Sequence, residues 1–313
     1  MNNKICTLFG ATGVIGKNLV RNLSKKNYRS IIYTRNPFQA NFLKTQATPG
    51  SIELKKWSPN NFDEIKESIK NSDVVINLIG ILYETRKQKF MNIHAGIPEA
   101  ISKICAQSDV KKFINISAIG ASQNSKSLYQ RSKFKGEVNA LTNFKNTVII
   151  RPSVIESPES NFSNLFAKLS FLPIVPILNK SYKFQPILVS DVADAIIKAI
   201  EVKDNLGKIY ELGGPKIISF QDIVKSILKT INKKRFVVEI PMPIAKIQST
   251  ITDLLPIPPI LTRDQCEILS EADNVVSNNH LTLKDLNINP SDVEEAMKRW
   301  LVRFRHGGQF SKV

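Results

Sequence analysis

The fold is decided by a glycine-rich stretch near the N-terminus, Leu8-Phe9-Gly10-Ala11-Thr12-Gly13-Val14-Ile15-Gly16. An apolar segment at 5–9 leads into it and fits one buried strand, and residues 17–26 follow with apolar side chains at helical spacing. In this context Gly10 permits a tight turn, Gly13 lets the backbone approach phosphates, and Gly16 lets the helix pack on its strand. The free N–H groups at the helix N-terminus then face the anion. Residues 10–16 are therefore expected to bind the pyrophosphate of a dinucleotide, with an ordinary strand–helix turn as the alternative.

The next strand predicts which dinucleotide is preferred. It is expected at 30–34, so that Thr34 and Arg35 stand at its end, nineteen residues beyond Gly16. Enzymes that prefer NAD usually place Asp or Glu there for the ribose hydroxyls, whereas Arg suits the 2′-phosphate of NADP. No acidic residue precedes Glu53. We therefore expect NADP(H) as the preferred cofactor, with NAD(H) as the second choice, unless Arg35 is only a solvated charge.

The composition indicates a folded protein with a basic surface. The chain has 313 residues and a formal net charge of +17, although abundant Asn and Ile leave open a bias of coding composition. Such a charge favours nucleic acid, anionic lipid or an acidic partner, but no nucleic-acid motif accompanies it, so nucleic acid is not expected. Three distant cysteines and three isolated histidines predict a reducing compartment and no metal site. No apolar run approaches the roughly 18 residues of a membrane-spanning helix. We expect a cytoplasmic protein, or one peripheral on the inner face of the cytoplasmic membrane.

Alternating strands and helices predict a doubly wound, Rossmann-type α/β sheet. After Arg35, strands are expected at 52–54, 73–80, 112–117 and 147–151, and helices at 62–69, at 89–107 and from 128 onward. The run 73–80 is apolar throughout most of its length, as a strand buried in a parallel sheet requires. Because ligands gather at the carboxyl ends of such strands, Leu78, Ile79, Gly80 and Pro152 are expected beside the cofactor. Residues 1–155 form the predicted nucleotide-binding domain.

The pattern beyond Pro152 is looser. A strand at 186–189, a helix at 192–200 capped by Asp191, and a strand at 208–212 are expected, and 186–214 would return to the first domain. Further helices are expected at 220–231, 263–269 and 290–304, with a structured loop or broken helices in the proline-rich stretch 240–261. Residues 156–185 and 215–313 form a predicted smaller C-terminal region. Its apolar segments around Leu172 and Pro256 could shape a pocket, a membrane-facing lip or a partner interface.

Three polar residues near the expected cofactor site are suited to acid–base chemistry. Tyr129 and Lys133 lie four apart on a predicted helix and hence on one face. A neighbouring ammonium is expected to lower the pKa of Tyr129 toward neutrality, so that its hydroxyl exchanges a proton with a substrate oxygen. Lys133 can also bind the nicotinamide ribose, and Ser117 can orient a substrate carbonyl. By spacing alone, a chance pair on a lysine-rich helix is equally compatible.

At these residues the chain resembles a known family. The glycine turn, Asn92, Ser117, Tyr129 and Lys133 resemble the extended and atypical short-chain dehydrogenase/reductases, and Asn92 joins the expected cofactor-binding residues through this resemblance. More narrowly, several segments look like the alpha-subcomplex subunit 9 family of respiratory complex I and its bacterial homologues. These segments are 75–84, 150–153, 184–187 with 191–193, 210–215 and 303–310.

The resemblance implies a Rossmann domain that holds NADP(H), with a smaller C-terminal region over the nicotinamide end. In members attached to complex I the nucleotide is thought to be structural. This chain keeps Tyr129 and Lys133, which many such subunits lose, so the resemblance leaves turnover open. It also has Lys55-Lys56-Trp57 where an Asp is often found near the adenine, which puts the adenine contacts in doubt.

Three functions are compatible with these observations. The first is an NADP(H)-binding protein of the complex I accessory type, connected with the respiratory chain and quinones. The second is an active NADPH-dependent oxidoreductase or epimerase/dehydratase acting on an unidentified carbonyl or quinone-like compound, and the third is a regulatory NADP(H) sensor. The basic C-terminus is either a solvated helix face or a docking surface for a respiratory complex or the inner-membrane surface. Its residues are Lys298, Arg299, Arg303 and Arg305 around Trp300.

Overall fold

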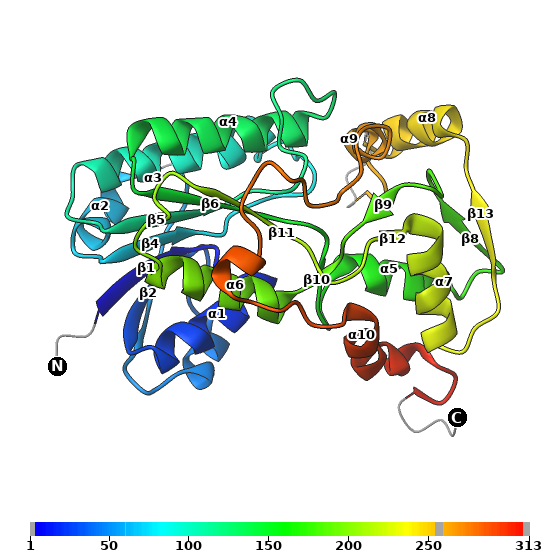
Figure 1. The fold of residues 1–313 in the computed structure, drawn as a ribbon, viewed down its shortest axis with the longest axis horizontal. Helices are drawn as coiled ribbons and strands as arrows, with labels where there is room; N and C mark the ends of the chain where they lie inside the picture. Colours follow the sequence, from blue (N-terminus) through cyan, green and yellow to red (C-terminus); the bar gives the residue numbers. More distant parts are fainter. Residues whose placement is uncertain (1–3, 60, 254–258, 309–313) are drawn as a thin grey trace.

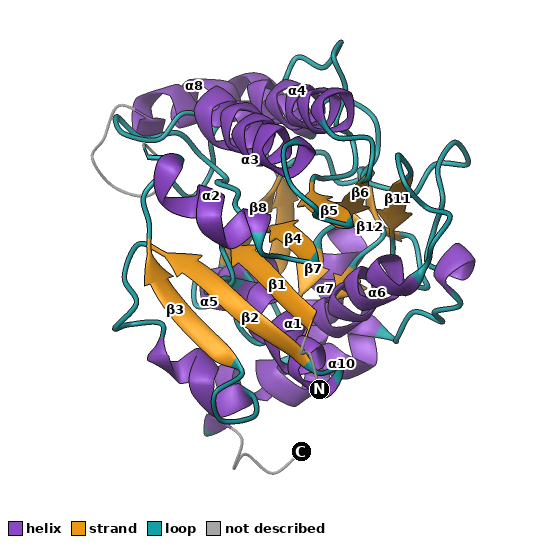
Figure 2. Cartoon of the chain, turned by 90° about the vertical axis from the view of Figure 1, so that its left-hand side faces the viewer, coloured by secondary structure: helices purple, strands orange, loops and turns teal. Residues whose placement is uncertain are grey.

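The centre of the molecule is a parallel sheet with seven strands in the order β11-β6-β5-β4-β1-β2-β3 (Figure 2). The structure, a computed structural model, describes residues 4–59, 61–253 and 259–308. The strands of this sheet are β1 (Lys4–Phe9), β2 (Tyr28–Thr34), β3 (Ile52–Lys56), β4 (Val74–Asn77), β5 (Lys112–Ile116), β6 (Thr147–Pro152) and β11 (Ile209–Leu212). The strand order reverses between β1 and β4, as in a doubly wound sheet. The predicted Rossmann-type fold is confirmed.

Helices cover both faces of this sheet (Figure 1). On one face, α1 (Val14–Lys25) packs against α6 (Val189–Glu201), and both helices bury apolar side chains such as Leu19 and Ile196 in a core with the strands. On the other face lie α2 (Asp63–Lys70), α3 (Ile97–Ala106) and α4 (Leu128–Asn143), with Ile65 and Ile101 in a second core. Removal of this apolar surface from water is the main force that holds the three layers together.

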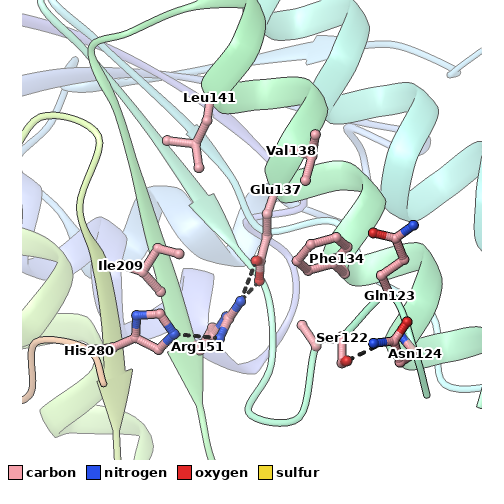
Figure 3. A pocket seen from close by; sticks show the side chains of 11 residues that line it. Ser122, Gln123, Asn124, Phe134, Glu137, Val138, Leu141, Arg151, Ile209 and His280 are labelled. Carbon is pink, nitrogen blue, oxygen red and sulfur yellow. Dashed lines mark hydrogen bonds and ion pairs between the residues drawn. The ribbon is translucent and has the colours of Figure 1, made fainter. Parts of the chain in front are cut away.

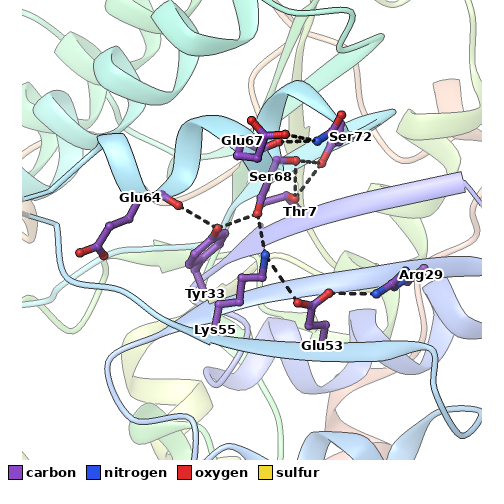
Figure 4. A network of polar contacts seen from close by, with 10 residues as sticks. Thr7, Arg29, Tyr33, Glu53, Lys55, Glu64, Glu67, Ser68 and Ser72 are labelled. Carbon is purple, nitrogen blue, oxygen red and sulfur yellow. Dashed lines mark hydrogen bonds and ion pairs between the residues drawn. The ribbon is translucent and has the colours of Figure 1, made fainter.

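A polar network lies between α2 and the sheet (Figure 4). The hydroxyls of Tyr33 and Ser68 are 2.7 Å apart, and those of Thr7 and Ser72 are also 2.7 Å apart. The ammonium of Lys55 donates to the Ser68 hydroxyl at 3.2 Å. Because these buried hydroxyls have partners, they fix the position of α2 without the cost of unsatisfied polar groups.

The smaller C-terminal region has a core of its own, shown on the right of Figure 1. Three two-stranded sheets pair β7 with β10, β9 with β12 and β8 with β13. These elements are β7 (Ile155–Glu156), β8 (Ile174–Ile177), β9 (Lys183–Phe184), β10 (Ile187–Leu188), β12 (Ile218–Ser219) and β13 (Phe236–Glu239). The helices are α5 (Asn161–Leu169), α7 (Phe220–Thr230), α8 (Met242–Asp253), α9 (Arg263–Ile268) and α10 (Val293–Leu301).

The chain passes between the two cores several times. After β10, helix α6 and strand β11 lie on the large sheet, and β11 pairs with β6. A later segment does the same, because Leu281 bridges to Tyr210 and the side chains of Leu283 and Leu286 enter the core beneath α1 and α6. That segment falls within the range 215–313 expected for the C-terminal region, but it packs on the sheet.

Two predicted boundaries are wrong, namely the start of α6 and the end of β4, because a polar side chain at each makes a hydrogen bond that was not expected. Helix α6 begins at Val189, directly after β10, so Asp191 lies in its first turn and does not cap it. The Asp191 carboxylate instead accepts hydrogen bonds from the backbone N–H (2.7 Å) and hydroxyl (3.0 Å) of Ser291. Strand β4 ends at Asn77, three residues early, because the Asn77 side chain accepts from the N–H of Ile79 at 3.2 Å and turns the chain.

Two further segments differ in form from the expectation. The helix expected at 89–107 begins with a π-helical turn, Met91–Gly96, before α3. In the stretch 240–261, expected as a structured loop or broken helices, the described residues include the helix α8, which tolerates Pro243 in its first turn, where no backbone donor is needed. Pro256 lies outside the described residues.

Candidate functional site

The glycine turn after β1 is packed on two sides and open on the third. Gly10 has φ of 79°, and a Cβ there would lie 3.0 Å from the backbone nitrogen of Ile79. A Cβ on Gly16 would lie 2.2 Å from the Cα of Ala11, so helix α1 packs directly on the turn. A Cβ on Gly13 would meet only the Gly10 carbonyl oxygen, at 3.4 Å. The outer face at Gly13 therefore has room for a ligand that approaches the backbone closely.

The N-terminus of α1 offers donors to that ligand. Gly13 is the N-cap, no side chain caps the helix, and its first turn contains no acidic residue. The first helical hydrogen bond runs from Lys17 N–H to Gly13 O at 3.2 Å, which leaves the N–H groups of Val14, Ile15 and Gly16 directed outward. Free N–H groups and the helix dipole favour an anion here. Residues 10–16 thus fit the pyrophosphate of a dinucleotide.

The carboxyl ends of β4 and β5 bring the expected catalytic residues toward this turn. A Cβ on Gly80 would lie 3.3 Å from the Lys133 ammonium. The same ammonium donates to the carbonyl of Ile116 at 3.2 Å and lies 5.9 Å from the ring centre of Tyr129. The loop after β4, the end of β5 and the start of α4 therefore meet in one place.

Ser117 supplies a polar group with no protein partner. Its backbone N–H donates to Ile150 O at 2.7 Å, which fixes the residue at the end of β5. Its buried hydroxyl has no hydrogen-bond partner in the described part of the chain. Leaving such a group unsatisfied costs about 1–3 kcal/mol. This hydroxyl is therefore a candidate partner for a polar group of a ligand.

The electrostatics of Tyr129 differ from the expectation. Burial, assisted by the carboxylate of Asp264, raises the pKa of Tyr129 to about 12, whereas the sequence predicted a lowered value. Burial also lowers the pKa of Lys133 to about 8, so its ammonium stabilises a phenolate less than expected. In this structure desolvation outweighs the attraction between the two groups.

His94 is a member of the site that sequence reasoning missed. It is buried on the π-helical turn, accepts from the N–H of Ile81 at 3.0 Å, and has its other ring nitrogen 2.9 Å from the Ser132 hydroxyl. Its ring contacts Tyr129 edge-on, with 5.1 Å between ring centres. Burial lowers the pKa of His94 to about 2, so the ring is neutral. An isolated histidine carries no local signal, although a π-turn is often found at functional sites.

The C-terminal region caps the helix that carries Tyr129, which the sequence also did not reveal. The Asp264 carboxylate accepts from the Ser127 hydroxyl at 2.7 Å and from the backbone N–H groups of Leu128 at 2.6 Å and of Tyr129 at 3.3 Å. Glu271 accepts from the Ser125 hydroxyl at 2.6 Å. Because these pairs are more than 130 positions apart, no local pattern could indicate them.

The remaining predicted cofactor residues lie around the same edge. Arg35 is exposed after β2 and makes no hydrogen bond or ion pair with the described residues, while the Thr34 hydroxyl accepts from Asn36 N–H at 3.3 Å. Asn92 is exposed on the π-helical turn, and Pro152 is buried at the end of β6. The Asn92 side chain makes no hydrogen bond with another described residue.

The segment that stands where an adenine-binding Asp is often found has a structural role. Trp57 is buried, and its ring contacts Phe9 edge-on with 5.1 Å between centres. Its indole N–H donates to Asn61 O at 2.6 Å. Trp57 therefore belongs to the core under α2.

A surface pocket of about 450 Å³ is lined by Phe134, Glu137 and Leu141 of α4 together with Arg151 and His280 (Figure 3). Its floor is a buried ion network in which Arg151 pairs with Glu137 at 2.6 Å and Glu211 at 3.2 Å, and contacts His280 at 3.1 Å. The guanidinium is already satisfied by two carboxylates, so it offers little to an anionic ligand. The network fixes α4 to β6 and β11, and we place the candidate site at the glycine turn.

The basic C-terminus is largely engaged within the protein. Lys298 pairs with Glu295, the Arg303 guanidinium donates to Pro158 O at 2.7 Å, and that of Arg305 donates to Thr230 O at 2.8 Å. Among the described residues there is no helix long and apolar enough to cross a membrane, and no group of His, Cys, Asp or Glu that could hold a metal.

Comparison with known proteins agrees with this geometry. The profile of the NAD dependent epimerase/dehydratase family matches residues 6–213. The chain is 31% identical to the mitochondrial NADH dehydrogenase [ubiquinone] 1 alpha subcomplex subunit 9 of Arabidopsis thaliana, over 97% of this chain and 79% of that protein. It is also 31% identical to the mouse subunit of that name, over 93% and 78%. The structure of a UDP-glucose 4-epimerase from Thermotoga maritima superposes with a TM-score of 0.70 at 16% identity, over 95% and 97% of the two chains, and shares the fold.

Proposed function

Because the chain belongs to the NAD dependent epimerase/dehydratase family, we propose that it binds NADP(H) along the carboxyl edge of its large sheet. The resemblance to the short-chain dehydrogenase/reductases and to subunit 9 of the alpha subcomplex is confirmed. The open face at Gly13 and the uncapped N-terminus of α1 support a pyrophosphate site. The exposed, unpaired guanidinium of Arg35 supports the 2′-phosphate of NADP over NAD.

We further propose that the nucleotide is mainly structural and that the protein is of the complex I accessory type. The observation that carries this is the position of Lys133, the expected activator of Tyr129, whose ammonium donates to the Ile116 carbonyl at 3.2 Å and lies 5.9 Å from the centre of the Tyr129 ring. Burial also raises the pKa of Tyr129, which makes its phenolate harder to form. The identity to subunit 9 of the alpha subcomplex extends through the C-terminal region, which supports an association with a respiratory complex.

A second candidate is an active oxidoreductase or epimerase/dehydratase, and the unpartnered hydroxyl of Ser117 favours it. Bound NADPH would supply a hydride. Ser117 would donate a hydrogen bond to the oxygen of a carbonyl or quinone-like substrate, and the Tyr129 hydroxyl would give that oxygen its proton. Lys133 would hold the nicotinamide ribose.

Mass spectrometry of the nucleotide released from the native protein tests the first proposal. We expect NADP(H), bound near one per chain, that is not consumed when a panel of carbonyl and quinone substrates is added. Release of NAD(H) alone, or of no nucleotide, would contradict the proposed cofactor.

Tyr129→Phe separates the two candidates, with Tyr28→Phe as its control. Tyr28 is also partly buried, but it begins β2 and so lies at the amino end of the parallel strands, away from their carboxyl ends. If the protein is an enzyme, Tyr129→Phe lowers NADPH turnover by about 10²–10⁴-fold while the control keeps it. If the nucleotide is structural, wild type and both variants hold NADPH without consuming it. Rapid wild-type turnover would refute the structural role.

A further inference from the structure

The outward face of the pair β8–β13 is apolar, although strands at a surface usually alternate between apolar and polar side chains. In β8 the inward residues Val175 and Ile177 are buried in the C-terminal core. The outward residue Ile174 is 49% exposed, and its neighbour in register on β13, Phe236, is 78% exposed. Burial in the protein's own core therefore explains only one face of this pair.

The chain before β8 extends the same apolar surface. Phe171 is 66% exposed and Leu172 is 52% exposed, and Pro173 is exposed between them and Ile174. We call Phe171, Leu172, Pro173, Ile174 and Phe236 the apolar tip. Strands β8 and β13, which contribute Ile174 and Phe236, lie at the right-hand end of the molecule in Figure 1, and β1 and β2 lie toward the opposite end.

Cations flank the apolar tip in the sequence. We call them the basic collar, which consists of Lys168, Lys229, Lys233, Lys234 and Arg235. Lys233 lies over the ring of Phe171, 4.0 Å from its centre, and Arg235 donates to Ser170 O at 2.8 Å, so collar and tip are in contact. No member of the collar pairs with a carboxylate in the part of the chain that the structure describes.

Acidic residues are absent from the sequence on both sides of this surface. Residues 160–190 and 223–238 contain no Asp or Glu. The acid that follows, Glu239, pairs with Lys180 at 3.5 Å. The positive charges of the basic collar therefore have no acidic residue near them in the sequence, and exposed apolar side chains lie beside them.

We propose that the apolar tip and basic collar dock on the surface of an anionic lipid bilayer. The tip enters the boundary between headgroups and acyl chains, and the collar contacts the headgroup phosphates. Charge complementarity favours this occupant, and the protruding Phe and Leu side chains distinguish it from a polar acidic protein. The surface differs from the basic C-terminus, whose arginines contact α5 and α7.

Co-sedimentation with vesicles tests the proposal. The full-length protein is incubated with phosphatidylcholine vesicles that contain either no anionic lipid or about one third phosphatidylglycerol. We expect binding to the anionic vesicles at 0.1 M salt, little binding to the neutral ones, and weaker binding at 0.5 M salt. Absence of binding to anionic vesicles overturns the proposal and leaves an acidic protein as the occupant.

Matched variants distinguish docking through the apolar tip and basic collar from general attraction between a basic protein and anionic vesicles. Phe171→Ser/Phe236→Ser is expected to weaken binding at least tenfold, whereas Phe38→Ser, at a residue 84% exposed on the other lobe, leaves it unchanged. Lys233→Gln/Lys234→Gln is expected to weaken it about 10–30-fold, at roughly fivefold per lysine. The control removes equal charge at Lys203 and Lys208.

A second measurement reports insertion directly. The variant Phe236→Trp is expected to show a blue-shifted emission with anionic vesicles and quenching by brominated acyl chains. Equal losses for collar and control lysines, or no quenching at position 236, would overturn insertion at the tip. Thermal unfolding of each variant within about 2 °C of wild type shows that folding is intact.

Discussion

Asp264 provides a sharp test of how the two cores depend on each other. Its carboxylate, on α9 in the C-terminal region, accepts hydrogen bonds at the N-terminus of α4 on the large sheet. Loss of a helix cap costs about 0.5–2 kcal/mol, and loss of a negative charge near a helix N-terminus costs about 0.3–1 kcal/mol. The carboxylate is partly exposed and Ser127 still caps the helix through Gln130 N–H, which reduces the loss, so Asp264→Ala should cost about 1–2 kcal/mol.

Two tryptophans allow the cores to be followed separately. Trp57 is buried under α2, and Trp300 packs against the C-terminal core. In urea denaturation, Trp57→Phe leaves Trp300 as the reporter, and Trp300→Phe leaves Trp57. We expect the two fluorescence transitions to coincide with Asp264 present and to separate in Asp264→Ala, because an interaction between the cores is lost.

The control is Asp63→Ala, an exposed acidic residue in the first turn of α2 that pairs with Lys66. It should cost at most about 0.5 kcal/mol and leave the two transitions together. Asp264→Asn keeps a hydrogen-bond acceptor without the charge, so its free energy of unfolding should lie between those of wild type and Asp264→Ala. A loss for Asp264→Ala no greater than that for Asp63→Ala would refute the reasoning.

Three further predictions concern the cofactor and pH. Arg35→Ala should weaken NADPH binding by roughly 1.5–3 kcal/mol in calorimetric titration and leave NADH binding unchanged, because a charge-assisted contact to the 2′-phosphate is lost. Arg21→Ala is the control. Equal losses of affinity for both cofactors would remove the argument from Arg35. Gly13→Val should abolish nucleotide binding and the thermal stabilisation that the nucleotide provides, so unchanged NADPH affinity would place the phosphates elsewhere. Burial raises the pKa of Glu156 from 4.5 to about 7, so the stability associated with its protonated form is complete below pH 4.5 and lost as pH rises through 7. The stability of Glu156→Gln relative to wild type should thus be roughly 1–3 kcal/mol higher at pH 8 than at pH 5 in urea denaturation, and an equal difference at both pH values would contradict the assignment.

The large sheet could be predicted because its signals are local. Residues 74–79 are apolar except for Asn77, and the glycines at 10, 13 and 16 have the spacing of a phosphate-binding turn. Each pattern determines the structure of its own segment, so neighbouring residues suffice to recognise it. Because β4 and β5 are neighbours in the sheet, the loop that contains Gly80 lies beside the end of β5, where Lys133 donates to the Ile116 carbonyl.

The rest of the site depends on contacts that a local pattern does not contain. The pKa of Tyr129 is raised by burial and by the carboxylate of Asp264, which comes from a distant part of the chain. Asp191 has the composition of a helix cap, but its carboxylate binds Ser291, a hundred positions away. In the C-terminal region, strands of two residues such as β9 and β12 are too short to produce a periodic signal.

The interlaced path of the chain has a consequence for biosynthesis. Strand β6 ends at Pro152, but its neighbour β11 ends at Leu212, 60 residues later. At roughly 5–20 residues per second, a ribosome needs about 3–12 s to make that stretch, so the nascent sheet has an open edge during this time. The exposed backbone of β6 is then a template for pairing with another chain. We expect the nascent protein to engage chaperones at this stage and to resist aggregation better once β11 has paired with β6 and Leu281 has bridged to Tyr210 on β11.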